Sequence, residues 1–382
     1  MTQTRSTDHR GHSATENAPV FTRRTVPAAN RIPAAQRSQR MRQPGFGRVL
    51  TEHMVTIRWS ADLGWHDARL DPYQDLRLDP ASVGLHHGQI VFEGLKAYSQ
   101  PDGGVGVFRP DLASERLRRS ARRLAMPELP ESLFLAAITE LVGADRDWVP
   151  ATVGSSLYLR PVLLATESDL GLRPAREYLF LLIAFVTDNF FPGEVSPLTV
   201  WVSGDYVRAA PGGTGEAKTP GNYAGSLLPA QEAKARGCDQ VVWLDAVERR
   251  WIEELGGMNL FFVYGPPDSP RLITPPLGGT ILPGVTRDAL ITLARGSGYA
   301  VDEQPLSITE WRSAAEDGSM AETFACGTAA VVAPVGTVRS TEGEWQVGGG
   351  VSGPVTLGLR RALVDIQHGL SPDHHGWVFP VR

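Results

Sequence analysis

The chain of 382 residues has only two cysteines, only three lysines and no long apolar run. Cys238 and Cys326 are too few and too isolated for a disulfide framework or a zinc site, which indicates a reducing compartment. The apolar stretch at residues 178–186 is far shorter than the roughly 20 residues that span a membrane, so it predicts a buried strand. We therefore expect a cytoplasmic protein without a membrane segment.

Charge is unevenly distributed along the chain. Residues 1–42 carry eight arginines against Asp8 and Glu16, a net charge of +6, and the remainder carries 29 basic and 40 acidic residues, a net charge of −11. The acidic body argues against nucleic-acid binding. The basic segment lacks a hydrophobic period, so residues 1–43 are predicted to be a disordered tail. An arginine-rich organelle transit peptide has a similar composition.

Residues 189–197 divide the chain, because Pro192, Gly193 and Pro197 break the pattern of strands and helices. We place an interdomain loop there, between a smaller N-terminal α/β domain at 44–188 and a larger C-terminal domain at 198–382. The sequence predicts strands at 53–60, 157–165, 177–187, 198–204, 240–246, 249–255 and 259–265, and a hairpin around 101–104. It predicts helices at 111–125, 131–146, 223–236, 285–298 and 355–369. This mixture indicates α/β and α+β domains.

Lys218 lies in the glycine-rich stretch APGGTGEAKTPGNYAGSLL at residues 210–228. The chain has 34 arginines, so a retained lysine suggests chemistry that a permanently protonated guanidinium cannot perform. A surface lysine in a flexible loop is the alternative. The string also approaches the nucleotide-binding pattern GxxxxGK[ST], but Ala217 replaces its glycine and Pro220 interrupts the helix that should follow. A nucleotide hydrolase is therefore a remote alternative.

The paired histidines His86–His87 and His374–His375 are weak candidates for a metal site. Neighbouring residues on a strand face opposite ways, and no cluster of acids or cysteines joins these pairs. No GxSxG element is present, so a serine hydrolase is also unsupported.

A lysine that forms a Schiff base with a cofactor needs four supporting groups. These are a phosphate clamp, a group near the phenolic oxygen, a carboxylate for the pyridinium nitrogen, and binders for the substrate carboxylate. The candidates are Arg116, Arg160, Tyr223, Glu254 and the turn at 282–286. Each is more often structural, and Arg116 would be one of many arginines on a solvated helix face.

Seven strings resemble the branched-chain aminotransferase family, the fold-type IV group of pyridoxal-phosphate enzymes. They are LHHGQIVFEGLKAY, SLYLRP, PGGTGEAKTPGNYAGSLL, GCDQVVWLDA, EELGGMNLFFV, ILPGVTRDAL and FACGTAAV. The similarity runs from about Phe46 to about Trp377 in the family's order, and it leaves the first 40 residues uncovered. It implies two domains that enclose pyridoxal 5'-phosphate at their interface.

The resemblance also implies a role for each matching residue. Lys218 matches the lysine that forms the Schiff base, Tyr223 the contact to the phenolic oxygen and Glu254 the partner of the pyridine nitrogen. The phosphate cup is matched by Arg116, Val285, Thr286 and Thr328. The substrate site is matched by Phe46, His87, Phe92, Tyr158, Arg160, Leu172, Phe190, Gly257, Thr328 and Ala329. The loop around Leu172 is expected to reach into a partner subunit, which implies a homodimer.

The expected reaction is transamination of branched-chain or related apolar L-amino acids with 2-oxoglutarate, giving 2-oxo acids and L-glutamate. His87 and Phe190 stand where the family commonly has tyrosine, so a larger or modified apolar amino acid is the alternative substrate. A D-amino-acid aminotransferase or an aminodeoxychorismate lyase would share the fold. The other lysines, Lys96 and Lys234, are expected to be dispensable for turnover.

Overall fold

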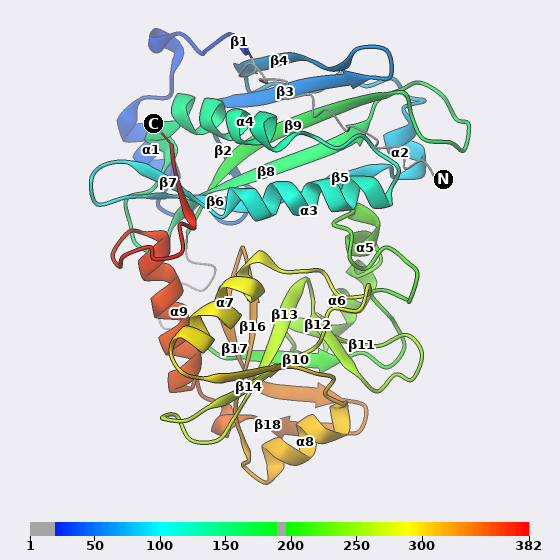
Figure 1. Ribbon diagram of the computed structural model, residues 1–382, viewed down its shortest axis with the longest axis vertical. Coiled ribbons are helices and arrows are strands. Elements are labelled where there is room, and N and C mark those ends of the chain that lie inside the picture. The colour runs from blue at the N-terminus through cyan, green and yellow to red at the C-terminus, as the bar shows by residue number, and fades with distance from the viewer. Residues whose placement is uncertain (1–19, 189–195, 382) are drawn as a thin grey trace, which may run out of the picture.

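The computed structural model describes residues 20–188 and 196–381, which form two lobes stacked along the long axis of the molecule (Figure 1). The upper lobe contains the N-terminal half of the chain and the lower lobe contains most of the C-terminal half. None of the helices in the described ranges is long and apolar enough to cross a membrane.

The upper lobe is built on a ten-stranded sheet with the order β1-β4-β3-β9-β8-β6-β7-β19, to which β2 and β5 are added beside β9 and β8. Its strands are β1 (Thr22–Arg23), β2 (Val49–Leu50), β3 (His53–Ser60), β4 (Gly64–Pro72), β5 (Ile90–Phe92), β6 (Leu95–Ser99), β7 (Val105–Phe108), β8 (Ser156–Ala165), β9 (Glu177–Thr187) and β19 (Val378–Val381). The expected strands at 53–60 and 177–187 and the hairpin of β6 and β7 are confirmed.

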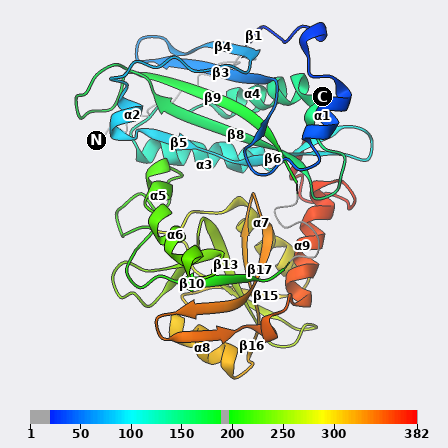
Figure 2. The same ribbon diagram turned by 180° about the vertical axis from the view of Figure 1, so that it is seen from behind.

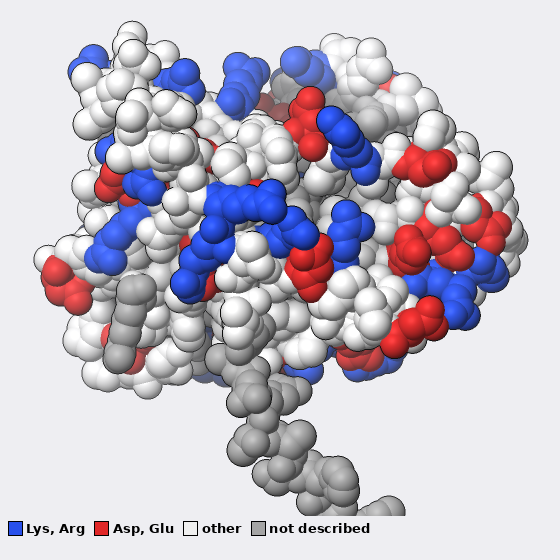
Figure 3. Space-filling model, turned by 90° about the horizontal axis from the view of Figure 1, so that it is seen from above, with Lys and Arg blue, Asp and Glu red and all other residues white. Residues whose placement is uncertain are grey.

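Two helices, α3 (Pro110–Arg123) and α4 (Glu131–Ala144), cover one face of this sheet (Figures 1 and 2). Leu117 of α3 and Phe134 and Ile138 of α4 are almost fully buried in the core between helices and sheet. The short helices α1 (Ala34–Arg40) and α2 (Val83–His87) lie at its margins. Seen from above, basic and acidic side chains are interspersed on this lobe (Figure 3).

The lower lobe contains a closed barrel. Its sheet runs β12-β11-β10-β17-β16-β13-β14-β15, and a further pairing of β13 with β12 closes six of these strands into a ring. The strands are β10 (Leu198–Val202), β11 (Gln240–Leu244), β12 (Ile252–Leu255), β13 (Met258–Tyr264), β14 (Arg271–Thr274), β15 (Ala300–Glu303), β16 (Met320–Gly327), β17 (Val331–Ser340) and β18 (Gly343–Gln346). Closure leaves these six strands without a free edge.

Strand β13 shows why the barrel needs helices outside it. Leu260 and Phe262 join one apolar core, and the alternate residues Phe261 and Val263 join a second. The second core includes residues of α7 (Val285–Gly296) and α9 (Pro354–Gln367), which pack on the outer surface. The other helices of this lobe are α5 (Pro220–Ala224), α6 (Leu227–Ala235) and α8 (Ile308–Glu316).

The prediction of a disordered tail at 1–43 is wrong for residues 20–43, which the structure describes, whereas residues 1–19 lie outside the described part. From residue 20 onward the chain packs on the upper lobe, where β1 pairs with β4 and Phe21 joins the core. The backbone N–H groups of Val26 and Ile32 donate hydrogen bonds to His53 and Glu52. These contacts order a segment whose composition alone indicates disorder.

The C-terminal boundary also needs correction. After α9 the chain leaves the lower lobe, and β19 pairs with β7 in the upper sheet (Figure 1). Strand β19 therefore belongs to the N-terminal lobe. The helix expected at 223–236 is two helices, α5 and α6. Pro229 has no N–H to bond the carbonyl of Gly225, so one continuous helix would lack that bond. The expected interdomain loop lies largely outside the described residues.

Candidate active site

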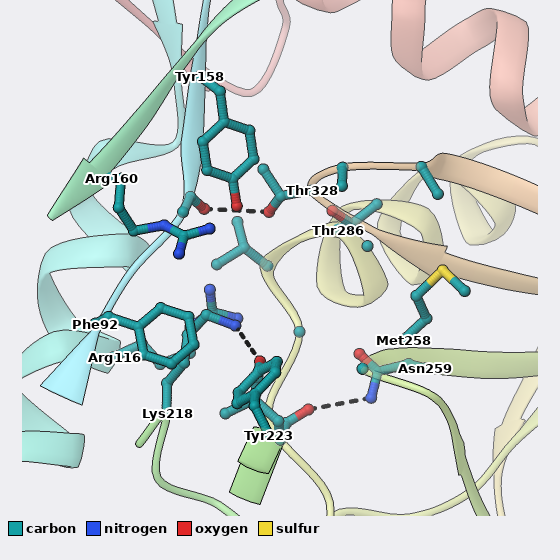
Figure 4. A pocket seen from close by; sticks show the side chains of 18 of the residues that line it. Phe92, Arg116, Tyr158, Arg160, Lys218, Tyr223, Met258, Asn259, Thr286 and Thr328 are labelled. Carbon is teal, nitrogen blue, oxygen red and sulfur yellow. Dashed lines mark hydrogen bonds between the residues drawn. The ribbon is translucent and has the colours of Figure 1, made fainter. Parts of the chain in front are cut away.

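A cavity of about 520 Å³ lies between the two lobes (Figure 4). The upper lobe contributes β5, β8 and α3, and the lower lobe contributes the Lys218 loop, β13, the start of α7 and the turn between β16 and β17. Thirteen residues predicted for the site line this cavity: Phe46, Phe92, Arg116, Tyr158, Arg160, Lys218, Tyr223, Glu254, Gly257, Val285, Thr286, Thr328 and Ala329. The structure therefore brings together residues that lie far apart in the sequence, from Phe46 to Ala329.

The Lys218 amine is held at the cavity wall by its neighbours. Its Nζ donates a hydrogen bond of 2.6 Å to Tyr223 Oη and lies 4.9 Å from the centre of the Phe92 ring. Its backbone is fixed to the upper lobe, because Lys218 N donates to Ser120 Oγ at 2.9 Å and Phe92 N donates to Lys218 O at 3.0 Å. The loop whose glycines suggest flexibility is thus tied to the upper lobe.

The sequence suggested that Pro220 interrupts a helix. In the structure Pro220 is instead the first residue of α5, a position that proline favours. The helix has only five residues and directs Tyr223 back toward Lys218 (Figure 4).

Glu254 lies at the end of the cavity formed by the barrel and is 2% exposed. Its Oε1 accepts a hydrogen bond of 2.7 Å from Leu282 N, and its Oε2 is 2.9 Å from Nε of Arg208. Burial raises the pKa of the Glu254 carboxyl to about 7, although Arg208 opposes this increase. Sequence analysis missed Arg208, which lies in a loop without a recognisable pattern.

Arg116 is buried and does not lie on a solvated face. Its Nε and Nη2 donate to the two carboxylate oxygens of Glu93, each at 2.7 Å, and its Nη1 donates to Pro283 O at 3.1 Å. Burial opposes the charge of the guanidinium, but Glu93 outweighs it and raises the pKa of Arg116. Glu93 was also missed, although a carboxylate inside the apolar string IVFEGL is a visible signal of a buried pair.

The first turn of α7 offers a site for an anion. Val285 and Thr286 line the cavity, and the N-cap residue Gly284 has no side chain that could cap the helix. The N–H groups at the start of this 12-residue helix are therefore available to a ligand. Asn259, a third residue missed in sequence, supports the preceding turn by donating to Leu282 O at 3.1 Å.

The opposite end of the cavity has an aromatic wall. Tyr158 stacks on Phe185 with ring centres 4.7 Å apart, and Phe46 packs against both rings edge-on. Gly94 is required beside Tyr158, because a Cβ at this position would lie 1.9 Å from Tyr158 Oη. Ile90, Val162 and Met258 complete the apolar lining and were not identified in sequence.

Two of the predicted residues that the structure describes do not line the cavity. His87 and Leu172 lie on a separate surface hollow of about 280 Å³, where Leu172 is 90% exposed. Phe190 lies outside the described residues. His86 and His87 belong to helix α2 and not to a strand as expected. In the described ranges, no three His, Cys, Asp or Glu side chains are grouped to hold a metal ion.

Lys96, which the sequence does not assign to the site, lies directly behind the cavity wall. It is 3% exposed, and its Nζ donates a hydrogen bond of 2.9 Å to the carbonyl of Ala329, which lines the cavity. Lys234, by contrast, is exposed on α6.

Comparison with known proteins now identifies the class. Residues 90–338 match the model of the amino-transferase class IV family, so the chain belongs to that family. Within it, the chain is 54% identical over 353 residues to the probable branched-chain-amino-acid aminotransferase of Streptomyces coelicolor, covering 92% of this chain and 96% of the relative. The chain is thus a member of the branched-chain-amino-acid aminotransferases, as its motifs indicated, and the nucleotide-hydrolase alternative is wrong.

Solved structures confirm the expected fold. The branched-chain amino acid aminotransferase of Escherichia coli aligns with a TM-score of 0.71 at 30% identity, covering 87% of this chain and 100% of that chain. A second branched-chain amino acid aminotransferase, from T.th. and solved with pyridoxamine 5'-phosphate, aligns with a TM-score of 0.68 at 29% identity, covering 85% and 98% of the two chains. The fold is that of the fold-type IV aminotransferases, whose cofactor is pyridoxal phosphate.

Proposed function

We propose that the protein transfers the amino group of leucine, isoleucine or valine to 2-oxoglutarate, with Lys218 as the catalytic base. The observation that carries this proposal is the Lys218 amine, which is hydrogen-bonded to Tyr223 within a cavity that also contains a buried carboxylate and an uncapped helix start. Leucine, isoleucine and valine suit its apolar wall. A larger apolar amino acid remains the alternative donor.

The residues present fit pyridoxal phosphate. Val285 and Thr286 would hold the phosphate at the start of α7, with Arg116 beside them, and Glu254 would face the pyridine nitrogen. The cofactor supplies an electron sink that makes the substrate Cα–H bond acidic. With the cofactor bound, Lys218 Nζ would move that proton, Tyr223 would orient the amine through its hydroxyl, and the Glu254 carboxylate would favour a proton on the ring nitrogen.

Arg160 supports glutamate and 2-oxoglutarate as the second pair of substrates. Its guanidinium carbon lies 5.1 Å from the Phe92 ring centre and 5.4 Å from that of Tyr158. The Arg160 side chain lines the cavity, where its positive charge would attract a second substrate carboxylate, whereas the apolar wall receives the side chain of leucine.

We also propose a homodimer that works in the cytoplasm. His87 and the exposed Leu172 share one surface hollow outside the cavity, as expected if this loop completes the site of a partner subunit. Both cysteines are buried free thiols, which suits a reducing compartment.

Formation of glutamate from leucine and 2-oxoglutarate tests the reaction, and Lys218→Ala tests the site. The purified protein should be yellow, and borohydride should attach the cofactor to Lys218. Lys218→Ala should lose at least about 10²–10⁴-fold in kcat, the usual contribution of a general base. Lys234→Ala is the matched control and should retain native activity, since its side chain is exposed. A colourless native protein without transaminase activity would disprove the proposal.

A further inference from the structure

The turn at residues 328–330 joins β16 to β17 and is held from behind by two buried cations. Lys96 Nζ donates to Ala329 O at 2.9 Å. Arg360 Nη1 donates to Ala330 O and to Val332 O, each at 2.9 Å. Three carbonyls of one short segment are therefore fixed by a lysine amine and an arginine guanidinium, which donate stronger hydrogen bonds when they are protonated than neutral groups do.

Lys96 occupies an unfavourable environment for an amine. It is 3% exposed on β6, and its described hydrogen bond goes to a carbonyl and not to a carboxylate. Burial, together with repulsion from Arg360, lowers the pKa of this amine to about 7. Leucine or methionine would fill such a position without that cost. The contact to Ala329 is therefore the feature of this site that calls for a lysine.

The contact with Ala329 also fixes the direction of the next amide. A trans peptide directs its carbonyl and its N–H to opposite sides, and the described chain has no cis peptide bond. The carbonyl of Ala329 points to Lys96, so the N–H of Ala330 points away from it. Ala329 and Ala330 line the main cavity, whereas Lys96 lines a separate cavity of about 20 Å³ behind the turn.

Backbone strain gives an independent indication that the turn needs support. Val331 has a φ of +61°, a left-handed conformation that is unusual for a β-branched residue. Arg360 binds the carbonyls of Ala330 and Val332, on either side of this residue. Such a conformation persists only where surrounding contacts impose it.

We propose that Lys96 is a positioning residue that, together with Arg360, holds the amides of the 328–330 turn in the geometry that binds the substrate carboxylate. The inference rests on the proposed function and on the family resemblance that assigns Thr328 and Ala329 of this turn to the substrate site. Lys96 acts through the Ala329 peptide and touches neither substrate nor cofactor. It therefore sets affinity for the carboxylate of every substrate without contributing to the apolar pocket.

Two competitive inhibitors separate this role from a general structural one. 4-Methylpentanoate has the carbon skeleton of leucine with its carboxylate, and 4-methylpentanamide is its neutral counterpart. The inhibition constants of both are measured with the cofactor-loaded native enzyme, with Lys96→Met and Lys96→Arg, and with the exposed control Lys234→Met. Bound cofactor is checked by its absorption in every variant.

In Lys96→Met we expect 4-methylpentanoate to bind about 10–100-fold more weakly, the usual effect of losing one charge-assisted hydrogen bond. Binding of 4-methylpentanamide should change by less than about threefold. The KM for leucine should rise by a similar factor to the loss for the carboxylate, with a smaller change in kcat. Lys96→Arg should recover most of the preference for 4-methylpentanoate over 4-methylpentanamide, because it retains a charged donor. Lys234→Met should match the native enzyme.

An equal loss of affinity for both inhibitors, or no loss for either, would overturn the proposal. If Lys96→Met does not fold, Lys96→Gln supports the same comparison, because its amide can still donate but carries no charge. Failure of the proposed function is distinguishable, since the native protein would then lack transaminase activity altogether.

Discussion

Replacing Glu254 by glutamine should separate stability from activity. Burial raises the pKa of the Glu254 carboxyl from 4.5 to about 7, so the folded protein binds this proton more tightly than the unfolded chain does. Stability therefore falls as the pH rises from about 4.5 to 7, and the loss above that window is about 3 kcal/mol. The ionised carboxylate thus lowers the stability of the folded protein, despite its ion pair with Arg208 at 2.9 Å.

Glutamine resembles the neutral carboxyl and keeps an oxygen for Leu282 N. With the cofactor removed, Glu254→Gln should match the native protein at pH 5 and be up to about 3 kcal/mol more stable at pH 8. Its kcat should nevertheless fall roughly 10²–10³-fold, as when a preorganised electrostatic group is lost. The assays are urea unfolding at both pH values and leucine transamination at pH 8.

The exposed pair Arg271–Asp302, at 2.6 Å, supplies the control. Asp302→Asn should change the free energy of unfolding by no more than about 1 kcal/mol. This difference from the native protein should be the same at pH 5 and pH 8, and turnover should be unaffected. A Glu254→Gln protein that is less stable than the native protein at pH 8 would refute the reasoning, because the pair with Arg208 would then be net stabilising. Near-normal turnover would remove Glu254 from the site.

Two further predictions concern the substrate pocket. Gly94→Ala should retain the cofactor but raise the KM for leucine about 5–100-fold, because the added Cβ would meet Tyr158 Oη and overpacking costs about 1–3 kcal/mol. Gly143→Ala is the control, because a Cβ at Gly143 would meet open space. An unchanged KM in Gly94→Ala would show that the Tyr158 side chain moves aside without cost. In mixed dimers with one Lys218→Ala subunit, His87→Tyr should change the ranking of leucine, isoleucine, valine and phenylalanine by kcat/KM only when it is on the inactive subunit. An effect from the active subunit would place His87 in its own cavity.

Much of the fold could be predicted from local patterns. Strand β9 has the expected bounds because residues 178–186 form an uninterrupted apolar run, and β3 because its apolar and polar residues alternate from Val55 to Ser60. Helices α3 and α4 follow from helical composition and spacing. The single helix expected at 223–236 is wrong because Pro229 has no N–H to donate to the carbonyl of Gly225. Membership of the aminotransferase family, now shown by the comparisons, could also be predicted, because its motifs are contiguous strings that local reading detects.

The sequence by itself determined the chemistry of this protein, because a lysine in a chain with so few of them, and the strings around Lys218 and Glu254, are local features. Only the tertiary structure decided which distant charges meet. Arg208 beside Glu254, Glu93 beside Arg116 and Lys96 behind Ala329 are pairs between separate segments. No residue period records such contacts, because the folding of each lobe, or the meeting of the two lobes at Lys96 and Ala329, brings the segments together, and burial makes each charge depend on its partner.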